Sequence, residues 1–577
     1  MRHRWTALGA IMLVVLATAA LAWDRWPPAS RDIPDSAAIT AGGELIAAIR
    51  SDPQSFNTYA GRNDNARQLL SYLVHARLVR IDRRTGAAEP WLAESWEHSP
   101  DFLTWTLKLR PGVRFSDGVL FSSRDVLFAF EAIRDPATAS ALKESLEISG
   151  QPLTVTAPDA GTVVVKFPTA FGPGLTILDN LPILPAHILE PALRAGTLKD
   201  AWSVSTAASG MPGLGPFRMD SYTPGERLAL TRNPHYWRRD AAGRPLPYLD
   251  RLRLEIVRDQ NTEILRLQQG QIDLLSREIR AEDYSRVKEL AASGTLQLVD
   301  AGVGLDADML WFNLATTAYK GDARKPWLQS RDFRAAVSEA VDRQAFVDSV
   351  LLGAGVPVCG PVSPGNVQWF VALPCERYDP DGARRTFRDK LGFADANGDG
   401  LLEDKWGNPV RFSVLTQQSD TVRMRSVGVL QEALRRVGVT VDVVALDLGA
   451  LIARFGAGEY DAIYFGVEAS SPDPAHNMDF WRSSGDFHLW NPGQSQPATA
   501  WEAQMDALMQ RQIASVDPAE RQRLFADVQR AFVEQMPVLY FAAPRIMVAM
   551  SSRVRNAQPL PPRPFVLWNA DSLAVSR

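Results

Sequence analysis

Residues 103–131 read LTWTLKLRPGVRFSDGVLFSSRDVLFAFE and combine the signals of a strand, two turns and a helix. Apolar and polar residues alternate over 103–110, which predicts a strand with one buried face. A Pro-Gly pair and an Asp-Gly pair then mark turns. This pattern predicts a scaffold and, taken alone, no chemistry. The helix that follows would be capped by Ser122 or Ser123 and would bury Val126, Leu127 and Phe130.

Four further segments complete a series that extends along most of the chain. They are GLGPFRMDSYTPGERLALTRNPHYW (213–237), LQQGQIDLL (267–275), SRDFRAAVSEAVDRQAFVDSVLLGAG (330–355) and YDPDGARRTF (378–387). Together with residues 103–131 they closely resemble ordered sequence blocks of family 5 extracellular solute-binding proteins, the peptide- and oligopeptide-binding receptors of ABC importers. The resemblance covers residues 43–570, which is nearly the whole chain.

The resemblance implies an α/β fold, the two-lobed clamshell of type II periplasmic binding proteins, with three domains and a discontinuous domain I. Strands that alternate with helices along the chain favour an α/β architecture independently. A chain of 577 residues is also too long for one core. The expected divisions are a signal peptide (1–22), a linker (23–42), domain I (43–70, 210–302 and 540–577), domain II (71–209) and domain III (303–539).

The first 22 residues have the pattern of a secretory signal peptide. Two arginines precede an apolar run over residues 7–21, and Ala20-Leu21-Ala22 fits a cleavage site. We therefore expect a periplasmic protein. The alternative is an uncleaved membrane anchor, because the run is close to the ~17–25 residues that span a bilayer. Without the two arginines the formal net charge changes from −4 to −6, and an acidic chain has no electrostatic attraction to nucleic acid.

The chain has two cysteines, Cys359 and Cys375, which lie sixteen positions apart in a segment rich in proline and glycine. In an oxidising compartment we expect them to form a disulfide, worth about 3 kcal/mol on the chain-entropy model. Two reduced, buried cysteines would require a cytosolic chain. A redox-active site is disfavoured because the C-x-x-C spacing is absent.

Motifs of catalytic sites are absent from the sequence. The chain has no G-x-S-x-G, H-E-x-x-H, P-loop or G-x-G-x-x-G pattern, and its seven histidines are scattered. His187-x-x-Glu190 comes nearest to a metal motif, but a polar first turn of a helix explains it better. The sequence therefore disfavours an enzyme.

The segment DANGDGLLEDKW (395–406) resembles a calcium-binding loop. Asp395, Asn397 and Asp399 occupy positions 1, 3 and 5 of an EF-hand-like pattern. Position 12, where a bidentate glutamate is expected, is Trp406. Two interpretations stay open here, a structural calcium site and a polar turn that leads into a hairpin.

Two loops are candidates for the ligand site through the family resemblance. SDPQSFNTY (51–59) resembles the loop after the first strand, whose backbone can pair with an extended peptide. TQQSDTVRMR (416–425) leaves a predicted strand and enters a helix, and an arginine there could bind a carboxylate through two hydrogen bonds. The candidate residues are Ser55, Phe56, Gln417, Gln418 and Arg423, with Arg425 as an equal alternative to Arg423.

A third loop, FGVEASSPDPAHNMDFWRSSGDFHLWNP (465–492), resembles the recognition loop of dipeptide and oligopeptide receptors. In those receptors an aspartate of this loop pairs with the α-ammonium group of the peptide, and the position corresponds to Ser470. A buried ammonium requires a charged partner, so Glu468 or Asp473 would have to replace the missing carboxylate. If neither faces the ligand, a ligand without a free amine is expected.

Tryptophan is plentiful, with 16 residues. Four of them lie in segments that approach the cleft in the family, and aromatic walls suit a ligand of varied side chains. For any single tryptophan a place in the core is still the stronger expectation. The four are Trp311, Trp369, Trp481 and Trp490, of which Trp311 and Trp490, with the neighbouring Asn313, are candidate ligand contacts.

We expect from these features a monomeric receptor that binds its ligand without catalysis and delivers it to the membrane permease subunits of an ABC importer. Peptides are the favoured ligand class, and oligosaccharides and metal chelates stay open. A secreted peptide hydrolase built on the same scaffold is the alternative from another class. A ligand-sensing regulator is weaker, because no DNA-binding helix pair is present. No cofactor is expected beyond the possible calcium, and no nucleic-acid partner.

Overall fold

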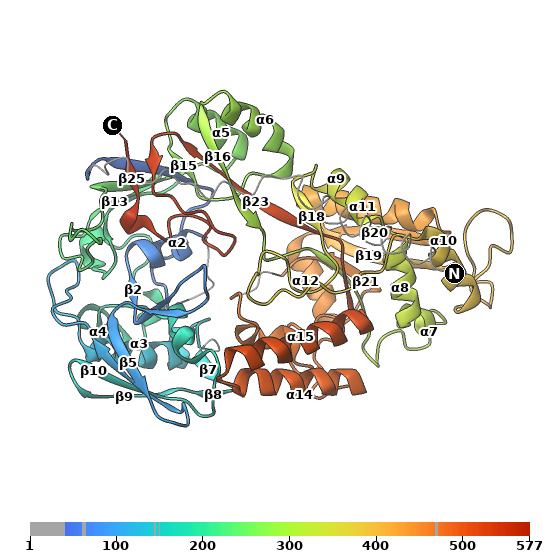
Figure 1. The fold of residues 1–577 in the computed structure, drawn as a ribbon, viewed down its shortest axis with the longest axis horizontal. Coiled ribbons are helices and arrows are strands. Elements are labelled where there is room, and N and C mark those ends of the chain that lie inside the picture. Colours follow the sequence, from blue (N-terminus) through green and yellow to red (C-terminus); the bar gives the residue numbers. More distant parts are fainter. Residues whose placement is uncertain (1–40, 61–64, 144–145, 149, 468–470, 577) are drawn as a thin grey trace, which may run out of the picture.

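The computed structural model describes residues 41–576 apart from 61–64, 144–145, 149 and 468–470. The predicted signal peptide and most of the predicted linker lie outside this part of the chain. Figure 1 shows two lobes, joined by strands that run from one to the other. The first lobe contains the described residues up to 303 and those from 542 onward, and the second lobe contains residues 309–540.

The first lobe is built around an eight-stranded sheet. Its strand order is β12-β13-β14-β1-β15-β23-β16, and β18 (Gly355–Pro357), which comes from the second lobe, pairs with the start of β23. Apart from β18, the strands come from three separate parts of the chain, which confirms the predicted discontinuous architecture; the exact domain divisions stay predictions. The bounds are β1 (Glu44–Ile49), β12 (Phe217–Thr223), β13 (Arg227–Arg232), β14 (Arg251–Ile256), β15 (Leu274–Leu275), β16 (Leu296–Val303) and β23 (Ala542–Ser551).

β1 lies at the centre of this sheet because its sequence is apolar on both faces. It pairs in parallel with β14 and β15. Leu45, Ala47 and Ile49 belong to the main core, whereas Ala48 faces the smaller cluster beneath two helices, α5 (Gln260–Gln268) and α6 (Ala281–Ala292). A near-continuous apolar run is typical of a strand that is covered on both sides.

The predicted strand within residues 103–131 belongs to a four-stranded antiparallel sheet of the first lobe. This sheet has the order β5 (Ala93–His98), β6 (Thr104–Leu109), β10 (Thr162–Lys166) and β9 (Thr154–Asp159). The predicted strand is β6, and the predicted helix is α3 (Ser123–Arg134), capped by Ser122 in a capping box with Asp125. One detail of the predicted face was wrong: Phe128 is buried and Leu127 is only half-buried. The reason is that α3 is covered on several sides, by α4 (Ala186–Arg194) as well as by the sheet.

The first lobe also contains several shorter elements. The helix α2 (Asn65–Leu73) lies between the two sheets of this lobe (Figure 1). Four pairs of short strands are present: β2 (Ala76–Arg77) with β11 (Pro182–Ile183), β3 (Val79–Ile81) with β4 (Ala88–Pro90), β7 (Glu147–Ile148) with β8 (Gln151–Pro152), and β24 (Val554–Arg555) with β25 (Ala574–Val575).

The second lobe surrounds a five-stranded sheet. Its order is β20 (Thr440–Leu446), β19 (Arg411–Gln417), β21 (Ala462–Phe465), β17 (Met309–Phe312) and β22 (Val538–Tyr540). Core clusters cover both faces: in β17, Leu310 and Phe312 face one cluster, and Met309 and Trp311 face the other. This is the two-residue period of a strand. The helices are α7 (Lys325–Leu328), α8 (Arg331–Glu339), α9 (Arg343–Val350), α10 (Pro380–Asp389), α11 (Thr421–Arg435), α12 (Leu448–Ala457), α13 (Met478–Trp481), α14 (Ala500–Ala514) and α15 (Pro518–Gln535).

Two connections join the lobes. Residues 304–308 lead from β16 to β17, and residue 541 leads from β22 to β23. Both leave the second sheet at the edge where Met309 pairs with Phe465 and Tyr540. Because β19, β20 and β21 are parallel, their carboxyl ends lie at this same edge. The edge therefore faces the junction between the lobes, and we call it the carboxyl edge.

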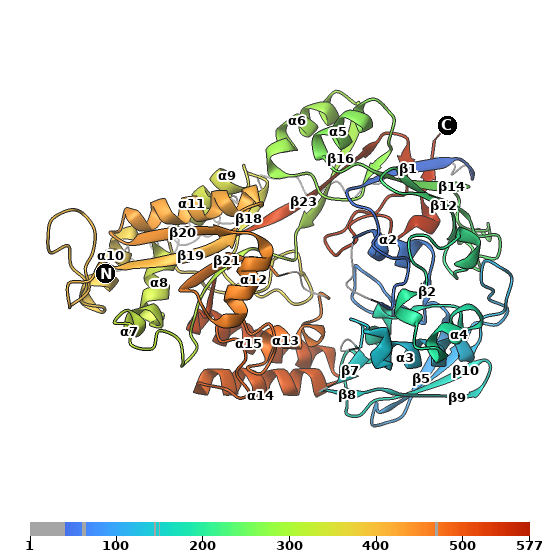
Figure 2. The same ribbon diagram turned by 180° about the vertical axis from the view of Figure 1, so that it is seen from behind.

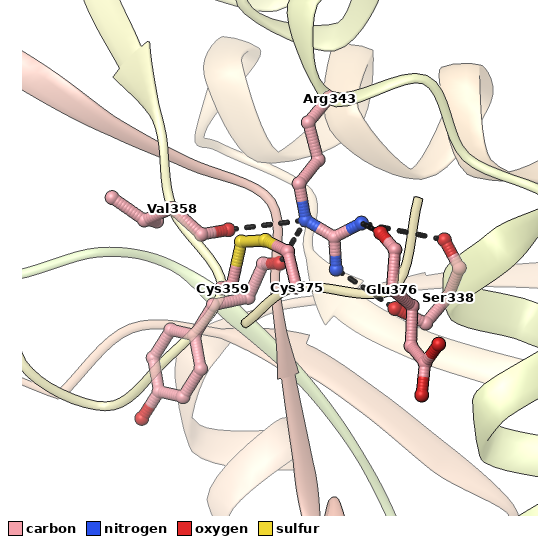
Figure 3. Close-up of a disulfide and its surroundings, with 7 residues drawn as sticks. Ser338, Arg343, Val358, Cys359, Cys375 and Glu376 are labelled. Carbon is pink, nitrogen blue, oxygen red and sulfur yellow. Dashed lines mark hydrogen bonds between the residues drawn. A yellow bond between two sulfur atoms is a disulfide. The ribbon is translucent and has the colours of Figure 1, made fainter. Parts of the chain in front are cut away.

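The predicted disulfide between Cys359 and Cys375 is present, with 5.6 Å between the two Cα atoms. The guanidinium of Arg343 lies beside the disulfide (Figure 3). It donates hydrogen bonds to the carbonyl oxygens of Val358 (3.2 Å) and Glu376 (3.3 Å), the residues next to the two cysteines. The disulfide and the arginine together hold this loop against α9 and β22.

The lobes also touch at a place far from the two connections. Gly172 of the first lobe donates a backbone hydrogen bond of 2.6 Å to the carbonyl of Ile513, at the end of α14. Next to it, the Phe171 ring meets the His476 ring, and Thr176 Oγ1 lies 3.2 Å from His476 Nε2. Both views place the end of α14 beside the domain that contains β7 and β8 (Figures 1 and 2).

Candidate functional site

The carboxyl edge of the second sheet is the candidate functional site. In α/β folds, ligands bind outside the carboxyl ends of parallel strands, where loops rather than strands define the surface. Four segments meet here: residues 304–308 before β17, 417–419 after β19, the first turn of α11, and residues 465–467 at the end of β21. Three of these segments belong to two loops that were predicted to form the ligand site, residues 416–425 and 465–492.

An ion pair occupies the centre of this edge. Arg423 in the first turn of α11 binds Asp308 through two nitrogens, with 3.1 Å from Nη2 to Oδ1 and 3.1 Å from Nε to Oδ2. The two side chains are partly exposed, Arg423 by 15% and Asp308 by 23%. Burial raises the pKa of the Asp308 carboxyl above its usual range, and the Arg423 guanidinium offsets part of that rise. A charged pair is thus held at the lobe junction without being sealed from solvent.

The surroundings fix the orientation of the Arg423 guanidinium. It lies 3.8 Å from the centre of the Phe465 ring, a cation–π contact, and its Nη1 donates to Gln417 Oε1 at 2.7 Å. Asp420 caps α11 and accepts hydrogen bonds from the backbone of Val422 and Arg423. Two of the predicted candidates, Gln417 and Arg423, are therefore in contact, and a ligand-binding role for them and for Gln418 stays a prediction. Arg425 turns away and donates to the carbonyl of Val350.

Gly466 brings the third predicted loop against the same pair. A Cβ atom at this position would overlap Asp308 Oδ1 and lie 3.2 Å from Arg423 Nη2. The backbone of the loop can therefore approach the carboxylate only because residue 466 is a glycine. Asp308 was not among the predicted site residues. It directly precedes the buried strand MLWF, and this position indicates a place at the site only when the strand order is known.

All four tryptophans lie in the core, which was the stronger expectation for any single one, and they do not form an aromatic wall. Trp311 and Trp490 are only 2% and 0% exposed and belong to the core of the second lobe, and Trp369 and Trp481 are buried there as well. Trp311 is buried because core clusters cover both faces of β17. Trp490 is anchored by a hydrogen bond from its Nε1 to Glu502 Oε1 at 3.2 Å.

Three further candidates also have structural partners. Asn313, 1% exposed, donates through Nδ2 to the carbonyl of Gly458 at 3.0 Å. In the first lobe, the Phe56 ring is buried and packs edge-on against Tyr222. Ser55 Oγ donates to the carbonyl of Trp202 at 3.2 Å. Asn313 and Phe56 are buried parts of their own lobes, which corrects the expectation that they are exposed to a ligand.

Comparison with known proteins assigns the family. The model of the bacterial extracellular solute-binding proteins, family 5 (Middle), matches residues 87–488, well over half of the chain. The chain belongs to this family.

Relatives and solved structures of family 5 match the chain over most of its length. A probable ABC transporter-binding protein of Deinococcus radiodurans is 27% identical over 540 residues, 90% of each chain. The oligopeptide-binding protein AppA of Bacillus subtilis is 25% identical over 534 residues, 90% of each chain. Its structure with a nonapeptide has a TM-score of 0.70 at 24% identity and covers 93% of this chain and 100% of that one. NikA of Brucella suis, solved with Fe(III)-EDTA, has a TM-score of 0.76 at 20% identity, covering 92% and 100%.

The recognition loop of this family 5 protein differs from the predicted arrangement. Glu468 and Ser470 lie outside the described residues. Asp473 is described, and its carboxylate is occupied by Arg521, with 2.6 Å from Nη2 to Oδ1 and 2.9 Å from Nη1 to Oδ2. It also accepts a hydrogen bond from the Ala475 backbone. Asp473 therefore has a structural role, as the cap of the turn at Pro474–His476 and as the partner of Arg521. A role for Asp473 in place of the missing carboxylate stays a prediction.

The calcium-like loop folds back on itself. Asp395 accepts hydrogen bonds from the backbone of Gly398 and Gly400, and Asn397 Nδ2 donates to Glu403 Oε1 at 3.0 Å. Bridges from Glu403 to Ala394 and Pro409 make the segment a hairpin. Within the described residues, no group of three or more His, Cys, Asp or Glu side chains is placed to hold a metal ion. The role of Asp395, Asn397 and Asp399 in binding calcium stays a prediction.

The start of α4 and the lengths of the helices bear on two alternatives, a metal site at His187 and a membrane anchor. His187 lies in the first turn of α4 with its Nε2 2.8 Å from Asp117 Oδ2, while Glu190 pairs with Arg124 and Arg194. These contacts fit a polar helix start. None of the helices in the described ranges is long and apolar enough to cross a membrane.

Proposed function

We propose that this family 5 protein binds a peptide between its two lobes, in the periplasm and as a monomer, and delivers it without catalysis to the permease subunits of an ABC importer. Family membership supports solute binding. The oligopeptide-binding relative AppA, whose structure holds a nonapeptide, supports peptides as the ligand class.

The arrangement of the two sheets carries this proposal. β23 pairs with β15 in antiparallel orientation near Met550 and begins at Ala542, so it extends beyond the carboxyl ends of β15 and its parallel neighbour β1. The carboxyl edge of the second sheet meets it from the other side, with the Arg423–Asp308 pair partly exposed at the junction. A ligand held between the lobes would contact loops of both sheets, and rotation about two connections would close the lobes around it.

The ligand class is tested by thermal unfolding. The exported protein is purified, unfolded and refolded to remove carried ligand, and then melted with random peptides, oligosaccharides or metal chelates. A ligand present at 100 times its Kd adds about 2.7 kcal/mol to the free energy of unfolding. We expect a rise in Tm with peptides. A rise only with sugars or chelates would contradict the peptide proposal, and release of cleaved products from the peptides would favour a hydrolase.

A further inference from the structure

Asp308 lies at the junction between the two lobes, at the carboxyl edge of the second sheet. It is the last residue of the connection 304–308 and directly precedes β17, so its position is fixed by both lobes. Among the described residues, the only hydrogen-bond donors to its carboxylate are two nitrogens of Arg423. A carboxylate has about four lone-pair sites, so acceptor capacity remains on a side chain that is 23% exposed.

The charges at this edge leave an excess of negative charge. Arg423 faces two carboxylates, Asp308 at 3.1 Å and Asp420 at 3.8 Å. The nearby Asp306 lies 4.0 Å from Arg563, so that carboxylate has a cation of its own. The three groups Asp308, Asp420 and Arg423 therefore sum to one negative charge, in a place where burial already disfavours the ionised form of Asp308. An additional cation would be stabilised here.

The geometry restricts how such a cation can reach Asp308. The Phe465 ring and the Gln417 amide hold the Arg423 guanidinium, and the Gly466 backbone touches the Asp308 carboxylate. A primary ammonium group is compact and donates three hydrogen bonds, which suits the acceptor sites that remain.

We propose that Asp308 is the carboxylate that accepts the primary ammonium group of the ligand, in place of the acid that is absent at Ser470. This inference rests on the proposed peptide-receptor function and names a specificity-determining residue for it. The same chemistry is offered by the amino terminus of a peptide and by a lysine side chain.

The test uses three pools of random pentapeptides. One has free amino termini and no lysine, the second is N-acetylated and has no lysine, and the third is N-acetylated with one lysine. Retention by the full exported protein is measured by equilibrium dialysis and mass spectrometry, for the wild type, Asp308→Asn and Asp461→Asn. Asp461 is the matched control, because it pairs with Arg324 at 2.9 Å in the same lobe but precedes β21, at the opposite edge of the sheet.

We expect the wild type to retain the free pool and to lose the second pool. Retention of the third pool would assign the ammonium to a lysine side chain and would equally support the inference. Asp308→Asn should weaken binding of the retained pool about 30-fold or more, the usual effect of removing one partner of a buried charge pair. Asp461→Asn should keep its affinity.

Two results would overturn the inference while the proposed function stands. These are equal retention of the free and acetylated lysine-free pools by the wild type, and unchanged affinity in a folded Asp308→Asn. The comparison of the pools on the wild type needs no variant. It therefore tests whether the ligand binds through an ammonium group even if Asp308→Asn does not fold. Retention of none of the pools by the wild type would instead overturn the proposed function and this inference with it.

Discussion

Trp490, a predicted ligand contact, instead belongs to a buried polar cluster around Glu502 at the start of α14. Glu502 is 2% exposed, and its Oε1 accepts hydrogen bonds from Trp490 Nε1 and lies 3.1 Å from His488 Nε2. Thr499 and Glu502 form a capping box at the start of α14. The T-x-x-E spacing was a visible signal for this cap. What the sequence could not indicate was that the loop from His488 to Trp490 would fold onto that cap, because the contact depends on tertiary packing.

The Glu502 cluster predicts a pH-dependent stability. Burial alone would raise the pKa of Glu502, but hydrogen bonds from His488, Thr499 and Trp490 lower it to about 2. Because the folded pKa lies below the ordinary value of 4.5, the stabilisation is present above pH 4.5 and is lost as the pH falls toward 2. The loss is on the order of 3 kcal/mol. Urea unfolding at pH 5 and pH 3 should show a smaller decrease for Glu502→Gln than for the wild type.

The exposed Glu226 provides the control for this experiment, since its side chain is 63% exposed beside Arg227. Glu226→Gln should keep the pH dependence of the wild type. An identical fall in the free energy of unfolding for the wild type and Glu502→Gln would show that the Glu502 carboxylate does not cause the pH dependence.

At the level of elements, the sequence predicted strands well and strand neighbours poorly. Alternation identified β6, and a strand was also predicted before the loop 416–425, where β19 lies, because such patterns are local. The pairing of β1 with β14 joins residues about two hundred positions apart, and no local pattern specifies it. The loop residues at the carboxyl edge were predicted from the family resemblance. Asp308 could not be predicted, because its place at this edge depends on the pairing of β17 with β21.

The disulfide loop gives a prediction at this scale. Replacing both cysteines, Cys359→Ser with Cys375→Ser, should lower the free energy of unfolding by about 3 kcal/mol through the loop entropy of the unfolded chain. The fold should persist, because Arg343 still donates to the carbonyl oxygens of Val358 and Glu376. Urea unfolding of the oxidised wild type and the double variant measures the difference. Equal stabilities would show that the cross-link does not stabilise the native state.

At the scale of the whole molecule, the contact between the lobes could not have been predicted from the sequence. The resemblance implied two lobes, but His476 was one of seven scattered histidines and Gly172 had no distinguishing pattern. In the structure, burial lowers the pKa of His476, which favours its neutral form between Phe171, Thr176 and the ion pair of Asp473 with Arg521. The lobes are thus joined at one end by the two connections, and they touch at the other end through Gly172 and Ile513.

Gly172 provides a test of this contact. A Cβ atom there would overlap the carbonyl oxygen of Ser515 and lie 2.7 Å from Arg521 Cδ, so Gly172→Ala should separate the lobes at this place. We expect a larger radius of gyration by small-angle X-ray scattering and about tenfold weaker ligand binding, which corresponds to about 1.4 kcal/mol. Gly428→Ala on the exposed face of α11, where a Cβ meets nothing within 4 Å, is the matched control. Unchanged scattering and affinity in Gly172→Ala would rule out a closing role for the contact.

The central claim, that this family 5 protein holds a peptide between its lobes, is tested most directly by native mass spectrometry. The refolded exported protein is mixed with an excess of random peptides, and the intact complexes are weighed. The claim predicts complexes of one protein chain with one peptide, which are lost on unfolding. A spectrum that contains only the free chain at peptide excess would contradict it.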